Sequence, residues 1–371
     1  MNKFGNQDKN NLATIFIVVL LLASSGSNSF AQSKCAPLID RAVRPARYVK
    51  IRPETQEITF DMPGMKVGSV SDTTLATGAT LFLFDKGATA NYDARGGSVA
   101  AAETNLLDES SYSNEIDGIL FSGGSTMGLE AGQGVRRRIF QERSQDAGDF
   151  DFIPSVPGAV VYDYGNRPEP GQNQLRYPDL IMGAATYDSA KENRMLIGRA
   201  GAGTSTTANK VSSPIWGGQG GAFKEVRLKD GFTFKIFAAV VLNSHGNIYL
   251  PDGSVLNRQK LKTLSPQVVT KGHKKNTTLS IVVTDVSLNR SQLKRLAVMV
   301  HTSMASSIRP FHTYTDGDIL FTVSLNKKEM PAEGAYDRED ILQTLAAETM
   351  TEAILKSAVT ANSPSQTAGK K

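Results

Sequence analysis

The sequence has almost no cysteine and none of the motifs of common metal or nucleotide enzymes. Cys35 is the single cysteine among 371 residues, so no internal disulfide can form and the nucleophile must be sought among hydroxyl groups. The four histidines are unrelated in spacing and include no HExxH pair, so no metal site is indicated. The glycine-rich turns lack the Gly-Lys-Ser/Thr of a phosphate loop, and we expect no cofactor.

Long apolar runs are absent except near the N-terminus. Residues 12–23 are apolar, follow the basic residues Lys3 and Lys9, and precede small polar residues that end at Ala31. This pattern is typical of a secretory signal, predicted here over residues 1–31. A retained anchor is the alternative, although the run is shorter than the roughly 20 residues of a transmembrane helix. We expect a periplasmic or secreted protein without stable membrane association after signal removal.

Clusters of one charge sign are also scarce. The formal net charge is +5, and lysine and arginine are scattered rather than interleaved with aromatic residues, so nucleic acid is not an expected partner. Hydrophobic residues make up 40% of the chain, which is ample for a globular core. The expected partner is therefore a small molecule.

Short apolar runs bounded by glycine, asparagine, aspartate or proline recur from residue 58 onward and indicate strands, several of them buried on both faces. Apolar residues at helical spacing predict helices over 126–143, 292–307 and 337–361. Because strands and helices are mixed along the chain, we expect an α/β protein with one mature domain. The polar end, from about residue 360, is expected to be disordered.

The junction between a basic loop and an apolar strand, in GHKKNTTLSIVVTDVSL, is the first candidate site. If the bond between Asn276 and Thr277 is cleaved, Thr277 carries both a hydroxyl and a free α-amine. The reference pKa of that amine, about 7.7–8.0, lets it accept the hydroxyl proton near neutral pH, so one residue supplies nucleophile and base. The alternative is an ordinary strand start, where β-branched residues are common.

Two carboxylates in TYTDGDILF form the second candidate site. Asp316 and Asp318 are two apart, so both side chains would project from the same face if they lie on the strand. Paired carboxylates perturb each other's pKa, which suits proton handling around a hydroxyl. The alternative is a simple Asp-Gly turn ahead of a strand.

The order of motifs resembles the L-aminopeptidase/D-esterase family of self-cleaving amidases, which includes β-aminopeptidases and nylon-oligomer hydrolases. The resemblance covers nearly the whole mature chain, from about residue 58 to 355. It is carried by DMPGMKVGSVSD, TGATLFLFDKGATANYDARGGS, AAETNLLD, ILFSGGSTMGLEAG, IPSVPGAVVYDYG, AAVVLNSHG, NTTLSIVVT and DGDILFTVS. It implies an α/β/β/α sandwich, self-cleaved into an α fragment (32–276) and a β fragment (277–371), and a homo-oligomer of such αβ units.

The resemblance also implies roles for individual residues. Thr277 matches the family's nucleophile, and Asn276 matches the residue on the other side of the cut. Asn243 matches the side-chain donor to the oxyanion, and Lys210 matches the active-site lysine. Asp316 and Asp318 match the supporting acidic pair. Tyr162 matches a pocket tyrosine, with Tyr164 as the open alternative.

The activity implied by the resemblance is hydrolysis of amide bonds in short peptides or amino-acyl amides through an acyl-enzyme, as in an aminopeptidase. Many β-aminopeptidases carry Ser as the nucleophile and Gly before it, whereas the Asn-Thr junction and Asp-Gly-Asp run look more like the nylon-oligomer hydrolases. An amidase for non-peptide ω-amino acid oligomers is therefore one alternative. A cleavage-dead periplasmic binding protein on the same scaffold is another.

Overall fold

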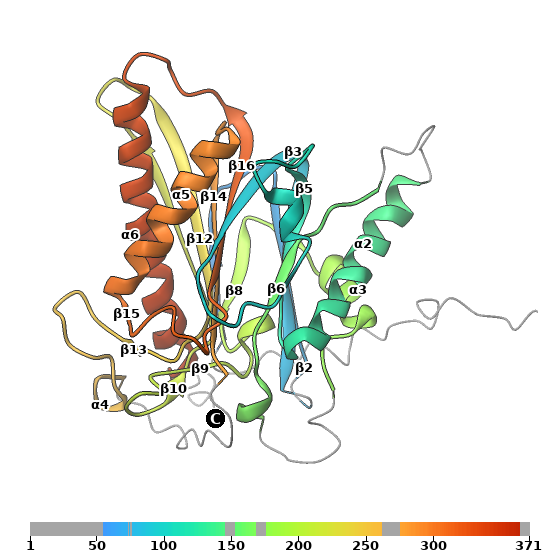
Figure 1. Ribbon diagram of the computed structural model, residues 1–371, viewed down its shortest axis with the longest axis vertical. Coiled ribbons are helices and arrows are strands. Elements are labelled where there is room, and N and C mark those ends of the chain that lie inside the picture. The colour runs from blue at the N-terminus through green and yellow to red at the C-terminus, as the bar shows by residue number, and fades with distance from the viewer. Residues whose placement is uncertain are drawn as a thin grey trace, which may run out of the picture. The chain divides into compact units, whose positions relative to one another are not determined.

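The computed structural model describes residues 55–363, except 73, 75, 145–152, 168–175 and 262–274 (Figure 1). They belong to one compact unit, residues 44–371. The signal expected over 1–31 and the last residues of the expected tail lie outside the described residues. Within the described part of the chain, no helix combines the length and apolar character needed to cross a membrane.

The described strands form one large sheet in the order β1-β8-β11-β12-β14-β16-β3-β5-β6-β4, with β2 paired to β3 and β7 paired to β2. β14 and β16 run parallel, and β16 pairs antiparallel with β3. The bounds are β1 (Thr55–Thr59), β2 (Met65–Asp72), β3 (Thr77–Ala94), β4 (Ala101–Ala102), β5 (Glu115–Ser122), β6 (Gly158–Val160), β7 (Lys191–Glu192), β8 (Arg194–Gly198), β11 (Gln219–Arg227), β12 (Thr233–Asn243), β14 (Thr277–Val286) and β16 (Ile319–Lys328). Two short pairs lie outside this sheet, β9 (Thr207–Ala208) with β10 (Ile215–Trp216) and β13 (Asn247–Ile248) with β15 (Ile308–Arg309).

The sheet curls so that its two halves face each other across a shared apolar core. Phe82 of β3 and Phe121 of β5 pack with ring centroids 5.4 Å apart. Phe237 of β12 lies 6.2 Å from Phe82, and Phe321 of β16 lies 6.1 Å from Phe121. These aromatic contacts join strands from both halves, so burial of the inner faces holds the curled sheet together.

A pair of helices covers the outside of each half (Figure 1). On one side, α5 (Arg290–Ser303) and α6 (Ala335–Ala361) bury their apolar stripes against β12, β14 and β16. On the other side, α2 (Glu130–Arg143) and α3 (Leu180–Asp188) cover β2, β3 and β5. The short helix α4 (Arg258–Leu261) lies apart from both pairs. The mixed α/β class expected from the sequence is confirmed.

The expected helices are present, with differences at their ends. The helix expected over 126–143 begins with a 3-10 turn, Ser125–Leu129, and the one expected over 292–307 ends in another, Met304–Ser306. Helix α6 runs to Ala361, as expected. Asn362, expected in a disordered tail, is buried, and its amide donates to the Trp216 carbonyl at 2.8 Å. The described start of that tail is therefore packed on the fold.

Candidate active site

The Asn276–Thr277 junction lies where β14 begins. All ten residues of β14 are buried, and Thr277, its first residue, pairs with Asn243, the last residue of β12. The Thr277 side chain is turned back toward the junction, and its hydroxyl donates a short hydrogen bond to the Asn276 carbonyl oxygen. The strand start expected at Thr277 is confirmed, and the hydroxyl touches the very peptide group that self-cleavage would break.

The Asn276 carbonyl oxygen has a second donor from the segment before β16. The backbone N–H of Gly317 donates to it at 2.8 Å. A Cβ atom at position 317 would lie 2.7 Å from the Thr277 hydroxyl oxygen and 2.9 Å from the Ser98 carbonyl oxygen, closer than real contacts allow. Glycine at this position therefore lets a backbone donor and a hydroxyl approach the same carbonyl.

Lys210 brings an amine to the same junction. Its Nζ donates to the Asn243 carbonyl oxygen at 2.9 Å and to the side-chain oxygens of Asn243 and Asn276 at 3.0 Å each. Burial lowers the pKa of Lys210 to about 7, although the charges of Asp316 and Asp318 oppose that shift. A large fraction of the amine is thus neutral near physiological pH and able to accept a proton.

The amide of Asn243 is already hydrogen-bonded on both sides. Its oxygen accepts from the Thr207 backbone N–H at 3.2 Å as well as from Lys210, and its nitrogen donates to the Tyr162 carbonyl oxygen at 3.0 Å. These bonds fix the amide beside Thr277, its partner in the strand pair. In this uncleaved chain the donor expected to serve an oxyanion is directed at Tyr162.

Asp316 and Asp318 lie just before β16, which begins at Ile319, and Asp316 forms an isolated β-bridge with Asn276. Both are buried. Asp316 accepts the Thr313 backbone N–H at 3.0 Å and the His245 backbone N–H at 3.3 Å. Burial, together with the charge of Asp318, raises the pKa of Asp316.

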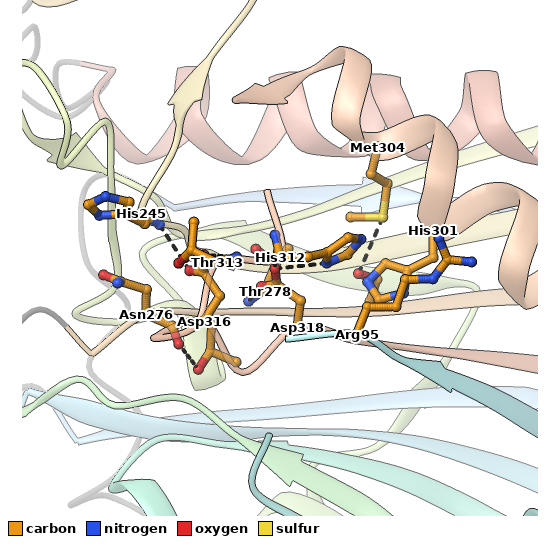
Figure 2. A network of polar contacts seen from close by, with 12 residues as sticks. Arg95, His245, Asn276, Thr278, His301, Met304, His312, Thr313, Asp316 and Asp318 are labelled. Atoms are coloured by element: carbon orange, nitrogen blue, oxygen red, sulfur yellow. Dashed lines mark hydrogen bonds and ion pairs between the residues drawn. The ribbon is translucent and has the colours of Figure 1, made fainter. Parts of the chain in front are cut away.

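The carboxylate of Asp318 reaches toward the nucleophile's strand. One oxygen accepts the Thr278 backbone N–H at 2.7 Å. The other accepts the His312 backbone N–H at 3.0 Å and lies 3.1 Å from the His312 ring nitrogen Nδ1 (Figure 2). Asp318 therefore holds the residue next to Thr277, while the hydrogen bonds of the two carboxylates to described residues do not include one from the Thr277 hydroxyl.

The backbone of this acidic segment is held by the residues that follow β3. The N–H of Ser98 donates to the Asp316 carbonyl oxygen at 2.8 Å, and that of Arg95 donates to the Asp318 carbonyl oxygen at 3.1 Å. A Cβ on Gly96 would lie 2.3 Å from both the Asp316 carbonyl oxygen and the Asp318 nitrogen. The close approach of these two segments requires the glycine of the ARGGS motif.

Tyr162 and Tyr164, the two candidates for the pocket tyrosine, differ in their surroundings. The ring of Tyr162 lies 5.2 Å from the Lys275 ammonium, one residue before the junction. The ring of Tyr164 is covered by the Arg167 guanidinium at 4.1 Å. Because the Tyr162 carbonyl also binds Asn243, Tyr162 is the tyrosine in contact with the candidate site.

Sequence reasoning missed two kinds of residue at this site. Gly317 acts through its backbone N–H, and the only sequence signal for it was its place in the Asp-Gly-Asp motif. The histidines seemed unrelated in spacing, but the rings of His301 and His312 lie 4.3 Å apart behind Asp318. Among the described residues, no group of three or more His, Cys, Asp and Glu is arranged to hold a metal ion.

Comparison with known proteins identifies the family and agrees with the fold. A family model described as peptidase family S58 matches residues 56–371. A 6-aminohexanoate-oligomer endohydrolase of Kocuria sp. (strain KY2) is 32% identical over 331 residues, covering 82% of this chain and 86% of that protein. An uncharacterized aminopeptidase of Mycobacterium bovis is 30% identical over 298 residues, covering 74% of this chain and 83% of that one.

The fold has a solved counterpart. The L-aminopeptidase D-Ala-esterase/amidase from Ochrobactrum anthropi, described as a variant of the Ntn-hydrolase fold, matches with a TM-score of 0.61 at 18% identity, over 81% of this chain and 84% of that one. The class of protein is therefore a hydrolase of amide bonds with an Ntn-hydrolase-type fold. The chain belongs to peptidase family S58, the L-aminopeptidase/D-esterase family that its motifs resemble.

Proposed function

We propose that this hydrolase matures by cleaving its own Asn276–Thr277 bond and then uses Thr277 as an N-terminal nucleophile on amide substrates. One observation carries the proposal: the Thr277 hydroxyl contacts the Asn276 carbonyl oxygen, which also accepts the Gly317 N–H at 2.8 Å. A nucleophile and a donor for the developing negative charge thus meet at one peptide group.

The maturation step is an acyl shift. The Thr277 hydroxyl oxygen forms a bond to the Asn276 carbonyl carbon, the carbon–nitrogen bond breaks, and the hydroxyl proton is transferred to the departing nitrogen. Lys210 is the neighbouring amine that relays this proton. Water then hydrolyses the ester, which leaves a carboxylate on Asn276 and a free amine and hydroxyl on Thr277.

Turnover repeats this chemistry on a bound amide. The α-amine of Thr277 accepts the hydroxyl proton, the oxygen attacks the substrate carbonyl, and water hydrolyses the acyl-enzyme. Release of the chain before Thr277 frees the space beside Asn243, whose amide then turns to the oxyanion. Removing one such donor typically costs about 100- to 1,000-fold in rate.

The mass of the purified protein tests self-cleavage directly. We expect two fragments, the smaller of which is residues 277–371 and gives the N-terminal sequence Thr-Thr-Leu-Ser. The larger fragment also reports whether residues 1–31 have been removed. An intact chain that hydrolyses amides at full rate would contradict the proposal.

Two substrate classes fit the proposal. The aminopeptidase-type reading predicts turnover of short peptides and amino-acyl amides. The 32% identity to a 6-aminohexanoate-oligomer endohydrolase favours ω-amino acid oligomers as a second class. Hydrolysis of matched panels, dipeptides and tripeptides against 6-aminohexanoate dimers and trimers, separates the two by their values of kcat/KM.

Lys210 should set the pH dependence of maturation. The precursor lacks the Thr277 α-amine, so the lysine, with a pKa of about 7, is the amine that titrates at the junction. We expect cleavage of refolded precursor to accelerate as pH rises through about 7, since only the neutral amine accepts a proton. Lys210→Arg keeps the charge at every pH and should cleave about 100-fold more slowly, without this titration. A wild-type pH profile in Lys210→Arg would exclude the lysine from proton transfer.

A further inference from the structure

Two histidines form a buried pair behind the candidate site. His301 belongs to α5, and His312 lies in the segment between β15 and β16. Their ring centroids are 4.3 Å apart and their planes are nearly perpendicular, at 75°. Each ring faces a carboxylate through Nδ1. His301 lies 2.9 Å from Asp93, and His312 lies 3.1 Å from Asp318 (Figure 2).

The protonation of the pair follows from its surroundings. A carboxylate only accepts hydrogen bonds, so each neutral imidazole must carry its proton on Nδ1. Burial lowers the pKa of His301, whose side chain is fully buried, and this favours the neutral ring. The Nε2 atoms of both rings are buried and have no hydrogen-bond partner among the described residues. Burying two unpaired acceptors costs free energy that apolar side chains would not, so the pair calls for a reason other than packing.

The pair connects to the nucleophile through Asp318. The Asp318 oxygen opposite His312 accepts the Thr278 backbone N–H at 2.7 Å. Thr278 directly follows Thr277, so a displacement of Asp318 moves the start of β14. At the other end of the pair, Asp93 bonds to the Arg95 guanidinium at 2.5 Å. Two polar groups thus lie end to end between β3 and the start of β14, one holding His301 and the other holding His312, and the packed rings join them.

We propose that His312, backed by His301, is a positioning residue for this reaction. Its Nδ1–H keeps the Asp318 carboxylate aimed at the Thr278 N–H, and Asp318 in turn keeps the Thr277 hydroxyl against the Asn276 carbonyl. The inference rests on the self-cleaving function proposed above, and it adds two residues that do not touch the reacting atoms.

Charged groups surround the pair and its carboxylates: Asp93, Arg95, Asp316, Asp318 and Lys210. Removing the His312 side-chain donor takes a hydrogen bond from Asp318. Its carboxylate is then held only by the backbone N–H groups of Thr278 and His312.

Three substitutions at one position separate positioning from packing. His312→Ala removes the donor, His312→Gly removes it without the strain of a Cβ at the φ of 58°, and His312→Asn places an amide N–H near the position of Nδ1. For His312→Ala and His312→Gly we expect slower self-cleavage and kcat lowered by about 10- to 100-fold with KM unchanged. His312→Asn should recover most of both effects. Ser291→Ala, at an exposed position in the first turn of α5, is the control and should match the wild type.

Wild-type kcat in His312→Gly would overturn the inference, as would equal losses in His312→Gly and His312→Asn. If the His312 variants do not fold, His301→Asn and His301→Leu are compared instead. The inference then requires that His301→Asn keeps more of the wild-type kcat than His301→Leu. Failure of the proposed function is recognised separately, because the wild-type chain itself would then remain uncut.

Discussion

Thr277→Val is expected to remain a single uncut chain without amidase activity. Valine keeps the shape of threonine, so β14 loses one hydroxyl and the stability should change by only about 1 kcal/mol. The lost hydroxyl is the group that contacts the Asn276 carbonyl oxygen, and the described residues include no cysteine that could replace it. Denaturing electrophoresis and intact mass report the cleavage, and thermal unfolding reports the fold.

The adjacent residue supplies a matched control for this experiment. Thr278 is also buried in β14, but its hydroxyl has no hydrogen-bond partner among the described residues. Thr278→Val keeps the backbone N–H that Asp318 holds, so it should cleave normally. Thr277→Ser should cleave more slowly than wild type, because serine keeps the hydroxyl and loses the methyl group that restricts χ1. Cleavage and activity in Thr277→Val would require another nucleophile.

The layers of the fold were predictable where burial is continuous. Strands such as β12 and β14 are buried along almost their whole length, and each contains a short run rich in apolar residues that indicates a strand. The strand β11, by contrast, contains glycines and charged residues, and its pairing with β12 depends on neighbours far away in the chain. A single sequence carries no local signal for such a strand, so only the structure reveals it.

The sequence predicted most residues of the candidate site, but few of the hydrogen bonds between them. Thr277, Lys210 and Asn243 were matched through the family resemblance, and the structure brings all three to one junction. Sequence spacing placed Asp316 and Asp318 where a strand begins, and they lie just before β16. It could not show that backbone N–H groups bind their carboxylates. Contacts made by backbone atoms leave no residue type to recognise, which is why Gly317 escaped notice.

The donation from Gly317 distinguishes this junction from an ordinary strand start. Its N–H already lies 2.8 Å from the carbonyl oxygen on which negative charge would develop during maturation. No reorganisation is then needed at the moment of attack, and such prearranged donors account for large rate effects. The same position is sterically closed, since a Cβ would meet the Thr277 hydroxyl at 2.7 Å.

Gly317→Ala should therefore fold and remain uncut, or cleave at least about 100-fold more slowly than wild type. The added methyl displaces either the hydroxyl or the donor, and a misplacement of about 1 Å can cost that factor. Gly132→Ala in α2 is the matched control, because a Cβ there finds no atom closer than 3.6 Å and should not affect cleavage. The measurement is the time course of fragment 277–371 from refolded precursor, with circular dichroism to verify the fold. Rapid cleavage of a folded Gly317→Ala would mean that the carbonyl is activated by some other group.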